Sequence, residues 1–208
     1  MTLDRLKPIL EAALLASQQP LSLAQLEQLF LDHERPSHTD LAQALEALAA
    51  DCAGRGVELV EVASGFRYQV RTEVHVYVTR LWAERSQKYS RALLETLALI
   101  AYRQPITRGE IEAVRGVVVS TQIIKTLEER EWVRVVGHRD VPGRPALYGT
   151  TRTFLDYFGL KNLDSLPTLA EIRDLESLMP ELQFPREAPI PAQLSDDSTL
   201  APSTETRQ

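Results

Sequence analysis

The sequence predicts a mainly α-helical protein with small β-hairpin wings, built from two winged-helix domains in tandem. The first observation behind this prediction is an internal repeat. Residues 13–22 (ALLASQQPLS) align without a gap on residues 98–107 (ALIAYRQPIT), and Leu26 falls on Ile111 by the same offset. The second observation is that both copies show the same order of patterns: helix, short helix, helix, then two short strands. Such a repeat indicates one structural unit that is used twice.

The first copy opens with a helix whose apolar residues recur at intervals of three and four, which places them on one face. This face consists of Leu3, Leu6, Leu10 and Leu14. Pro20 ends the helix, because proline disfavours the helical conformation in the residue before it and has no N–H to donate. Ser22 is then placed to cap a short second helix that runs to Phe30.

A third helix and a hairpin complete the first copy. Residues 39–53 carry leucines at helical spacing, and two glycines follow that stop the helix. Residues 57–63 and 66–71 flank Ser64-Gly65, and the second of these strands alternates apolar and polar side chains, which is typical of a half-buried strand. We expect Cys52, on the apolar stripe of the third helix, to be a buried thiol that packs like a small apolar side chain.

The second copy repeats this order with its own helix caps. Ser90, Thr107 and Ser120 each precede a helical pattern, as capping residues do. The expected elements are helices over 90–103, 107–115 and 120–131, and strands over 132–137 and 146–149. Pro142-Gly143 provides the turn between these strands, because glycine permits the positive φ of a type II turn.

The same patterns predict where the domains end. A further helix containing Val74, Tyr77 and Trp82 is expected to pack back on the first domain, and residues 84–89 are expected to form a hinge. Aromatic residues after the second wing predict a closing helix, and a proline-rich stretch with few apolar residues predicts a disordered tail. The expected division is 1–85 for the N-terminal winged-helix domain, 86–160 for the C-terminal one, 161–179 for a short helical extension and 180–208 for the tail.

The charge distribution argues against a protein whose main task is to bind DNA. The net charge is −6 and the pI is about 5.3, whereas nucleic-acid-binding domains are typically basic. The third helix of the first domain has no basic residue, although this helix normally reads the major groove. The second domain is weakly positive, and its wing has three candidate phosphate contacts: Arg134, Arg139 and Arg144. A DNA-binding winged-helix transcriptional regulator is therefore kept as the alternative hypothesis.

The sequence shows no pattern that is typical of catalysis. Phosphate-binding glycine loops and the Gly-x-Ser-x-Gly motif are absent, and the four histidines have unrelated spacings. We therefore expect no enzymatic activity, no catalytic residue, no cofactor, no metal and no small-molecule substrate. No apolar run reaches the roughly 18 residues of a membrane helix, and the first residues lack the pattern of a secretory signal. A cytoplasmic protein without membrane contact is the expectation.

Two long segments of the second copy are recognisable as family motifs. They are residues 97–108 (LALIAYRQPITR) and residues 142–151 (PGRPALYGTT). With their flanking segments, they resemble the segregation and condensation protein B (ScpB) family over roughly residues 3–170. The chain departs from the family pattern at Val118-Val119, where a polar residue is common, and at Glu131-Trp132, where Gly-Leu is common.

The resemblance implies a non-enzymatic subunit of a condensin-like complex that acts in chromosome condensation and partition during cell division. It implies a homodimer held mainly by the N-terminal domains. It also implies that the C-terminal domain binds the kleisin subunit, segregation and condensation protein A (ScpA), which bridges an SMC ATPase. At most weak, non-specific contact with DNA is expected. The implied location is the cytoplasm, in association with the nucleoid.

Two sets of side chains are candidates for contacts with partners. The second domain has more aromatic residues near its wing than a small core needs, and such residues are typical anchors of interfaces. The expected partner-binding residues are Tyr102, Ile106, Leu147, Tyr148 and Tyr157. The first domain has more apolar side chains than its core needs. The expected dimerisation residues are Leu29, Phe30, Leu31 and Trp82.

Overall fold

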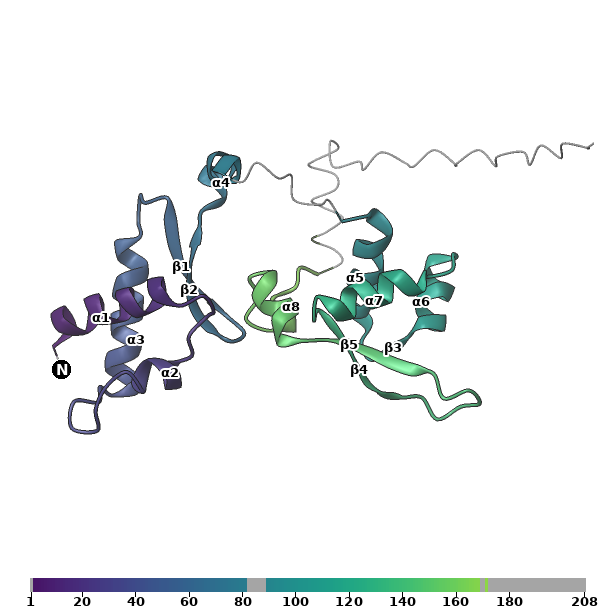
Figure 1. Cartoon of the computed structure of the whole chain (residues 1–208), viewed down its shortest axis with the longest axis horizontal. Coiled ribbons are helices and arrows are strands. Elements are labelled where there is room, and N and C mark those ends of the chain that lie inside the picture. The colour runs from purple at the N-terminus through teal and green to yellow at the C-terminus, as the bar shows by residue number, and fades with distance from the viewer. Residues whose placement is uncertain (1, 82–88, 169–170, 172–208) are drawn as a thin grey trace, which may run out of the picture.

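The computed structural model describes residues 2–81, 89–168 and 171, and it contains two units of similar design (Figure 1). Each unit has its own cluster of buried apolar side chains, so the chain has two hydrophobic cores. The predicted tandem of winged-helix domains, mainly helical with small hairpin wings, is confirmed.

The first unit has three helices and a hairpin in the predicted order, followed by a fourth helix and a 3-10 turn. Its elements are α1 (Leu3–Ala16), α2 (Leu23–Glu27), α3 (His38–Asp51), β1 (Val57–Val62), β2 (Gly65–Val70), α4 (Thr72–Val78) and η1 (Thr79–Leu81). Ser22 caps α2 and Ser37 caps α3, each in a reciprocal capping box. The predicted cap at Ser22 is therefore confirmed, whereas α3 begins one residue earlier than expected because Ser37 provides its cap.

The core of the first unit lies between α1, α2, α3 and the hairpin. Its buried side chains are Leu6, Leu10, Leu14, Leu26, Phe30, Leu41, Ala44, Leu45 and Leu48. Phe30 is only 7% exposed, because its ring fills the core of its own domain. Its expected place in a dimer interface stays a prediction. Cys52 is buried as predicted, and its S–H donates to the carbonyl of Leu48.

The helix predicted after the first wing forms as α4, and it touches the first domain only through half-buried side chains such as Val74, which lies beside Gly56. None of the side chains of α4 or η1 is buried, and Tyr77 and Leu81 are largely exposed. The physical reason is visible in Figure 1, where β2 carries the chain beyond the three helices before α4 begins. Trp82 and most of the predicted hinge lie outside the described residues.

The second unit repeats the first with a slightly larger sheet. Its elements are α5 (Arg91–Arg103), β3 (Ile106–Thr107), α6 (Arg108–Arg115), α7 (Thr121–Glu129), β4 (Val133–His138), β5 (Ala146–Thr150), α8 (Arg152–Tyr157) and η2 (Leu163–Ser165). Ser90, Thr107 and Ser120 cap their helices as predicted. The three strands are antiparallel in the order β3-β5-β4. The two-residue strand β3 was not predicted, because it is too short to show an alternating pattern.

Trp132 is the largest buried side chain of the second unit. Its ring centroid lies 5.2 Å from that of Tyr89 and 4.6 Å from that of Tyr157. The buried residues around it are Leu93, Leu97, Ile100, Ala101, Ile106, Ile111, Val119, Ile124, Leu127, Val133 and Phe154. Ile106 is 4% exposed and belongs to the core of this unit. Its expected role as a partner contact stays a prediction.

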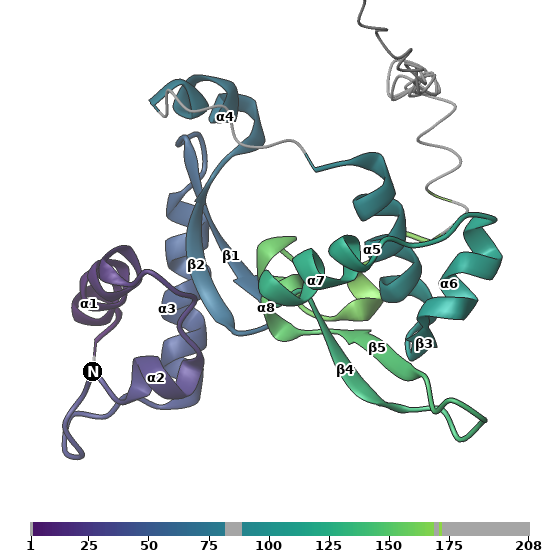
Figure 2. The same ribbon diagram turned by 45° about the vertical axis from the view of Figure 1, so that its right-hand side comes forward.

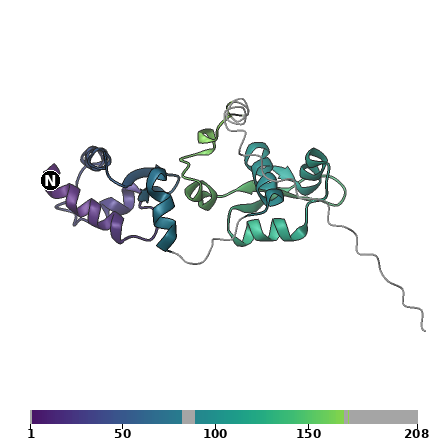
Figure 3. The same cartoon turned by 90° about the horizontal axis from the view of Figure 1, so that it is seen from above.

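The tip of the first wing contacts the second unit at α8 and the turn that follows it. Ser64 donates its N–H to Oδ1 of Asp156 at 2.9 Å and its hydroxyl to Oδ2 at 2.6 Å. The N–H of Ala63 donates to the carbonyl of Leu160 at 3.0 Å. Figure 2 shows the β1–β2 hairpin running toward α8, and Figure 3 shows α8 between the two units. We call these contacts the wing-tip contact.

An ion pair between Glu61 and Lys161 flanks the wing-tip contact. Val62 lies between the two sets of contacts in the sequence and is buried, although it belongs to neither core. Within the described residues, polar contacts therefore join the two units, and each core closes within its own unit.

The first wing is itself fixed to the loop between α1 and α2. Leu21 and Phe66 exchange two backbone hydrogen bonds of 2.9 Å each. Gly65 has a φ of +143° next to this bridge, and a Cβ at this position would lie 2.2 Å from the carbonyl oxygen of Leu21. Only glycine fits here, because both the backbone conformation and the space exclude a side chain.

Little of the region after α8 falls within the described residues. η2 provides one helical turn at the start of the predicted extension. The rest of the predicted helix, apart from residues 168 and 171, and the predicted tail over 180–208 lie outside the described residues. Within the described ranges, the longest apolar helices are too short or too polar to cross a bilayer.

We expect Gly65→Ala to lower the free energy of unfolding of the first unit by about 3 kcal/mol or more, because overpacking and backbone strain add. Gly54→Ala is the matched control: Gly54 also has a positive φ, but no atom lies within 4 Å of the added Cβ. Its cost should be about 1 kcal/mol, from the backbone conformation alone. Urea unfolding measures both values, and equal costs would contradict the close packing against Leu21.

We expect Asp156→Ala to open the wing-tip contact without unfolding either unit. The amides of Ala63 and Ser64 should exchange with deuterium about tenfold faster or more, because hydrogen bonds to charged groups contribute about 1.5–3 kcal/mol. The amide of Phe66, which bonds to Leu21, should keep its protection and serves as the internal control. Unchanged exchange at Ser64 would mean that Asp156 does not hold the wing tip.

Candidate partner-binding surfaces

The described residues offer surfaces for contact and few features of an enzyme site. Within residues 2–81, 89–168 and 171, no three histidine, cysteine or acidic side chains come together as a metal site. The positions of the charged and the exposed apolar side chains therefore decide what these surfaces can contact.

The helices that would read DNA in a winged-helix regulator are poorly suited to that task. In α3, the hydroxyl and N–H of Ser37 donate to Asp40 and lower the pKa of its carboxyl group, so this end of the helix is negatively charged. In α7, Nζ of Lys125 lies 3.6 Å from Oε1 of Glu129, and both side chains are exposed. Neither helix presents the row of free cations that base and phosphate contacts require.

The three wing arginines do not form one patch. Arg139 makes an ion pair of 3.0 Å with Glu110 on α6. The N–H and hydroxyl of Thr107 also donate to this carboxylate, and together with Arg139 they lower the pKa of Glu110. Arg144 is exposed at the wing tip, and Arg134 lies at the start of β4. A phosphate contact by these residues stays a prediction.

The three predicted tyrosines lie at different places in the second unit. Tyr157 is 53% exposed and packs on Trp132, at the end of the domain where Tyr89 precedes α5. Tyr102 lies near the other end of α5, a helix about 20 Å long, where its hydroxyl donates to the carbonyl of Pro167 at 2.6 Å. Tyr148 is half-buried in β5, and burial raises its pKa. The structure does not gather them into a single groove.

Leu147 and the dimerisation candidates differ in accessibility. Leu147 is half-buried in β5, opposite Gly137 of β4. Leu29 and Leu31 are both exposed after α2, on either side of the buried Phe30. They are thus available for contact with another molecule, whereas Phe30 is not.

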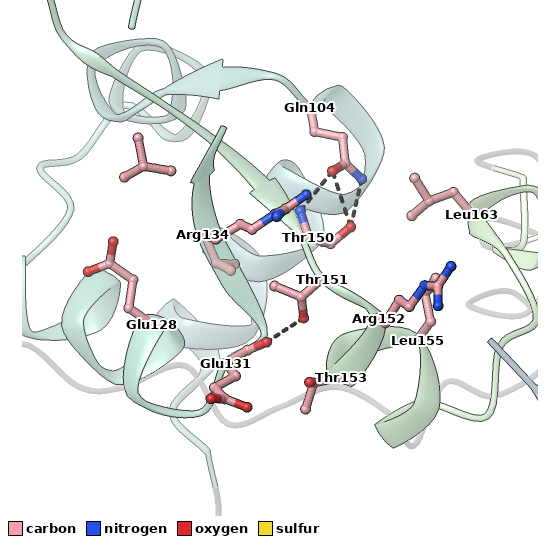
Figure 4. Close-up of a pocket in the computed structure, with 12 residues that line it drawn as sticks. Gln104, Glu128, Glu131, Arg134, Thr150, Thr151, Arg152, Thr153, Leu155 and Leu163 are labelled. Carbon is pink, nitrogen blue, oxygen red and sulfur yellow. Dashed lines mark hydrogen bonds between the residues drawn. The ribbon is translucent and has the colours of Figure 1, made fainter. Parts of the chain in front are cut away.

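A hollow beside the second wing was missed by the sequence analysis. It has a volume of about 790 Å³ and lies between the start of β4, the end of β5, α8 and η2 (Figure 4). Its lining residues are Gln104, Glu128, Glu131, Val133, Arg134, Val135, Thr150, Thr151, Arg152, Thr153, Leu155 and Leu163. The run of threonines around Arg152 is the one signal in the sequence that could have indicated it.

One wall of this hollow is held by a side-chain amide. Oε1 of Gln104 accepts the backbone N–H of Thr150 at 2.7 Å, and its Nε2 donates to the Thr150 hydroxyl at 2.9 Å. Gly149 precedes this threonine, and a Cβ there would lie 3.0 Å from both Gln104 and Val136. The absence of a side chain at Gly149 therefore leaves room for the Gln104 amide and for Val136. Figure 4 shows the Arg134 side chain extending toward Thr150.

The first unit has a smaller apolar hollow between α2, α3 and its wing. Its volume is about 210 Å³. It is lined by Leu23, Ala42, Leu45, Glu46, Ala49, Leu59 and Phe66. This hollow lies in the groove between α3 and the first wing, and Glu46 is the acidic residue among those that line it.

Comparison with known families shows which family this chain belongs to. The family model of the segregation and condensation complex subunit ScpB matches residues 8–169. This chain belongs to the ScpB family. The segregation and condensation protein B homolog of Coxiella burnetii is 56% identical over 178 residues, which cover 86% of this chain and 84% of that protein. Segregation and condensation protein B of Syntrophotalea carbinolica is 45% identical and covers 86% of this chain and 89% of its own length.

Solved structures of ScpB proteins are also similar in sequence. The crystal structure of ScpB from Mycobacterium tuberculosis is 36% identical, covers 77% of this chain and 98% of that one, and has a TM-score of 0.36. A crystal structure of a dimer of the ScpB N-terminal domain in complex with an ScpA peptide is 30% identical. It covers 38% of this chain and 98% of that one, with a TM-score of 0.35.

The ScpB family match includes both units of this chain. Residues 8–169 contain the second core, the first core except for Leu6, the wing-tip contact and the hollow beside the second wing. The resemblance carried by residues 97–108 and 142–151 therefore extends over both units.

Proposed function

We propose that this chain is a non-enzymatic subunit of a condensin-like SMC–kleisin complex that acts in chromosome condensation and partition. In this proposal it forms a homodimer, binds the kleisin ScpA and reaches the SMC ATPase through that kleisin, in the cytoplasm at the nucleoid. The observation that carries the proposal is the ScpB family match over both winged-helix domains.

The exposed apolar side chains of the first domain support a homodimer through that domain. A contiguous group of exposed apolar side chains typically marks an interaction surface, and Leu29 and Leu31 lie within one turn after α2. The large exposed apolar side chains of the first domain are Leu3, Ile9, Leu15, Leu29, Leu31, Val76, Tyr77 and Leu81. One ScpB relative was crystallised as a dimer of its N-terminal domain with an ScpA peptide, and we carry this assembly over to the present chain.

The second domain is proposed to bind the kleisin. Tyr157 offers an exposed ring that is held in place by the buried Trp132, and rigid aromatic side chains of this kind are typical interface anchors. Tyr102 could extend this contact only if the kleisin segment follows the length of α5, since the two tyrosines lie toward opposite ends of that helix.

Titration calorimetry of the full chain with the kleisin ScpA from the same organism tests the proposal. We expect saturable binding with little dependence on nucleic acid. Failure to bind the kleisin, together with tight sequence-specific binding to duplex DNA, would instead support the transcriptional regulator.

We expect the double variant Leu29→Glu/Leu31→Glu to convert the parent dimer into a monomer at tens of micromolar. Placing four charges in a two-fold interface removes apolar contact and adds like-charge repulsion. Val118→Glu is the control, because Val118 is even more exposed than the two leucines but lies in the second domain. Light scattering measures the mass, and a double variant that stays dimeric would exclude this part of the surface.

We expect Tyr157→Ala to weaken kleisin binding by about thirtyfold, because truncating an aromatic anchor commonly costs about 2 kcal/mol. Tyr157→Phe keeps the ring on Trp132 and loses only the hydroxyl contact with Tyr89, so its affinity should stay within about twofold of the parent. Calorimetry gives the affinities, and circular dichroism verifies the fold. Equal binding by parent and alanine variant would remove Tyr157 from the interface.

A further inference from the structure

The last described residues of the chain begin a helix. Thr168 and Glu171 form a reciprocal capping box, in which the N–H of Thr168 donates to Oε2 of Glu171 at 2.6 Å and the N–H of Glu171 donates to the Thr168 hydroxyl oxygen at 3.3 Å. Hydrogen bonds from Thr168 lower the pKa of the Glu171 carboxyl group, and a negative charge stabilises the first turn of a helix. Glu171 itself has the helical conformation. The helix predicted in this region therefore starts after Thr168.

The sequence that follows this box, residues 169–179, has the pattern of a short amphipathic helix. Apolar residues recur at intervals of three and four: Leu169, Ile172, Leu175 and Met179. Pro180 then ends the pattern, because proline breaks a helix. An isolated helix of fewer than about 12 residues is marginal in water, and it gains most of its stability when its apolar face packs on another surface. This segment therefore needs a surface that covers its apolar face.

The start of this segment is fixed beside one end of α5. The hydroxyl of Tyr102 donates to the carbonyl of Pro167 at 2.6 Å, and Leu166 packs against the second core. From Tyr102, the outer face of α5 continues through Ala98 to Leu94, at intervals of four residues. Ala98 is exposed and Leu94 is half-buried. The outer face of α5 is thus an apolar strip that begins where the segment begins.

The segment and α5 also match in length and charge. α5 has 13 residues and is about 20 Å long, and residues 169–179 as a helix would be about 16 Å long. The segment contains three acidic residues and one arginine, whereas α5 contains two arginines and one glutamate. That glutamate, Glu95, is paired with both Arg91 and Arg115. An acidic segment that runs back along α5 therefore meets a net positive face.

We propose that residues 169–179 form a helix that docks antiparallel on the outer face of α5 in the same chain. The small side chain of Ala98 lets the two helices approach closely. The segment is attached directly beside this face, which raises its local concentration and favours it over a separate molecule as the occupant. The docked helix covers Tyr102, so a partner that follows the length of α5 has to displace it.

Hydrogen exchange of the full chain tests whether the segment is docked. We expect the amides of residues 172–179 to exchange at least about tenfold more slowly than in a synthetic peptide of residues 166–182, because docking protects their helical hydrogen bonds. Ala98→Glu places a charge on the docking face and should remove this protection. Ala113→Glu is the matched control, since Ala113 is an exposed alanine of α6, and it should exchange like the parent. Exchange in the parent as fast as in the peptide would overturn the proposal.

An engineered cysteine pair identifies what occupies the face of α5. In Ala98→Cys/Ile172→Cys, both thiols lie four residues from the contact between Tyr102 and the start of the segment, so mild oxidation should close a disulfide within one chain. The native Cys52 is buried in the first unit. Ala113→Cys/Ile172→Cys is the control and should stay reduced. A disulfide-linked dimer would assign the face to the segment of a second copy, and a protected segment without any disulfide would place it on another surface. Either result would overturn the proposal.

Discussion

The arrangement of the two units depends on the small wing-tip contact. Each unit closes its own core, so hydrophobic burial stabilises the units separately and contributes little to their relative position. The hydrogen bonds from Ser64 to Asp156 have a charged acceptor and contribute about 1.5–3 kcal/mol, whereas the exposed pair of Glu61 and Lys161 contributes about 1 kcal/mol or less. Contacts of this size favour one arrangement, yet a partner that prefers another can still change it.

Most elements could be predicted because their signals are local. A serine or threonine cap depends on residues two or three positions apart, and the predicted caps at Ser22, Ser90, Thr107 and Ser120 are all present. The features that were missed join distant parts of the chain. The wing-tip contact links residues 92 positions apart, and the amide that supports the hollow links residues 46 positions apart. No periodicity along the sequence encodes such pairs, so they become visible only in the folded chain.

The accessibility of single apolar residues was harder to predict than the fold. Leu29, Phe30 and Leu31 are consecutive, yet only Phe30 points into the core, because the chain leaves α2 in a turn where neighbouring side chains diverge. The strand pairing of Ile106 with Tyr148 likewise places the isoleucine inside. The helix α4 has a suitable apolar pattern, but β2 delivers it beyond the core it was expected to cover. In each case the path of the backbone decides which side chains remain for partners.

The separation of the two cores has a mechanical consequence for a protein of a chromosome-organising complex. A pulling force applied between the first and second units acts on the polar bonds at Ser64 and Ala63 before it reaches any buried leucine. These few bonds give way one after another, whereas breaking a core requires the cooperative loss of many contacts at once. Under tension the molecule would lengthen by parting its halves, and each half would keep its fold and its binding surface.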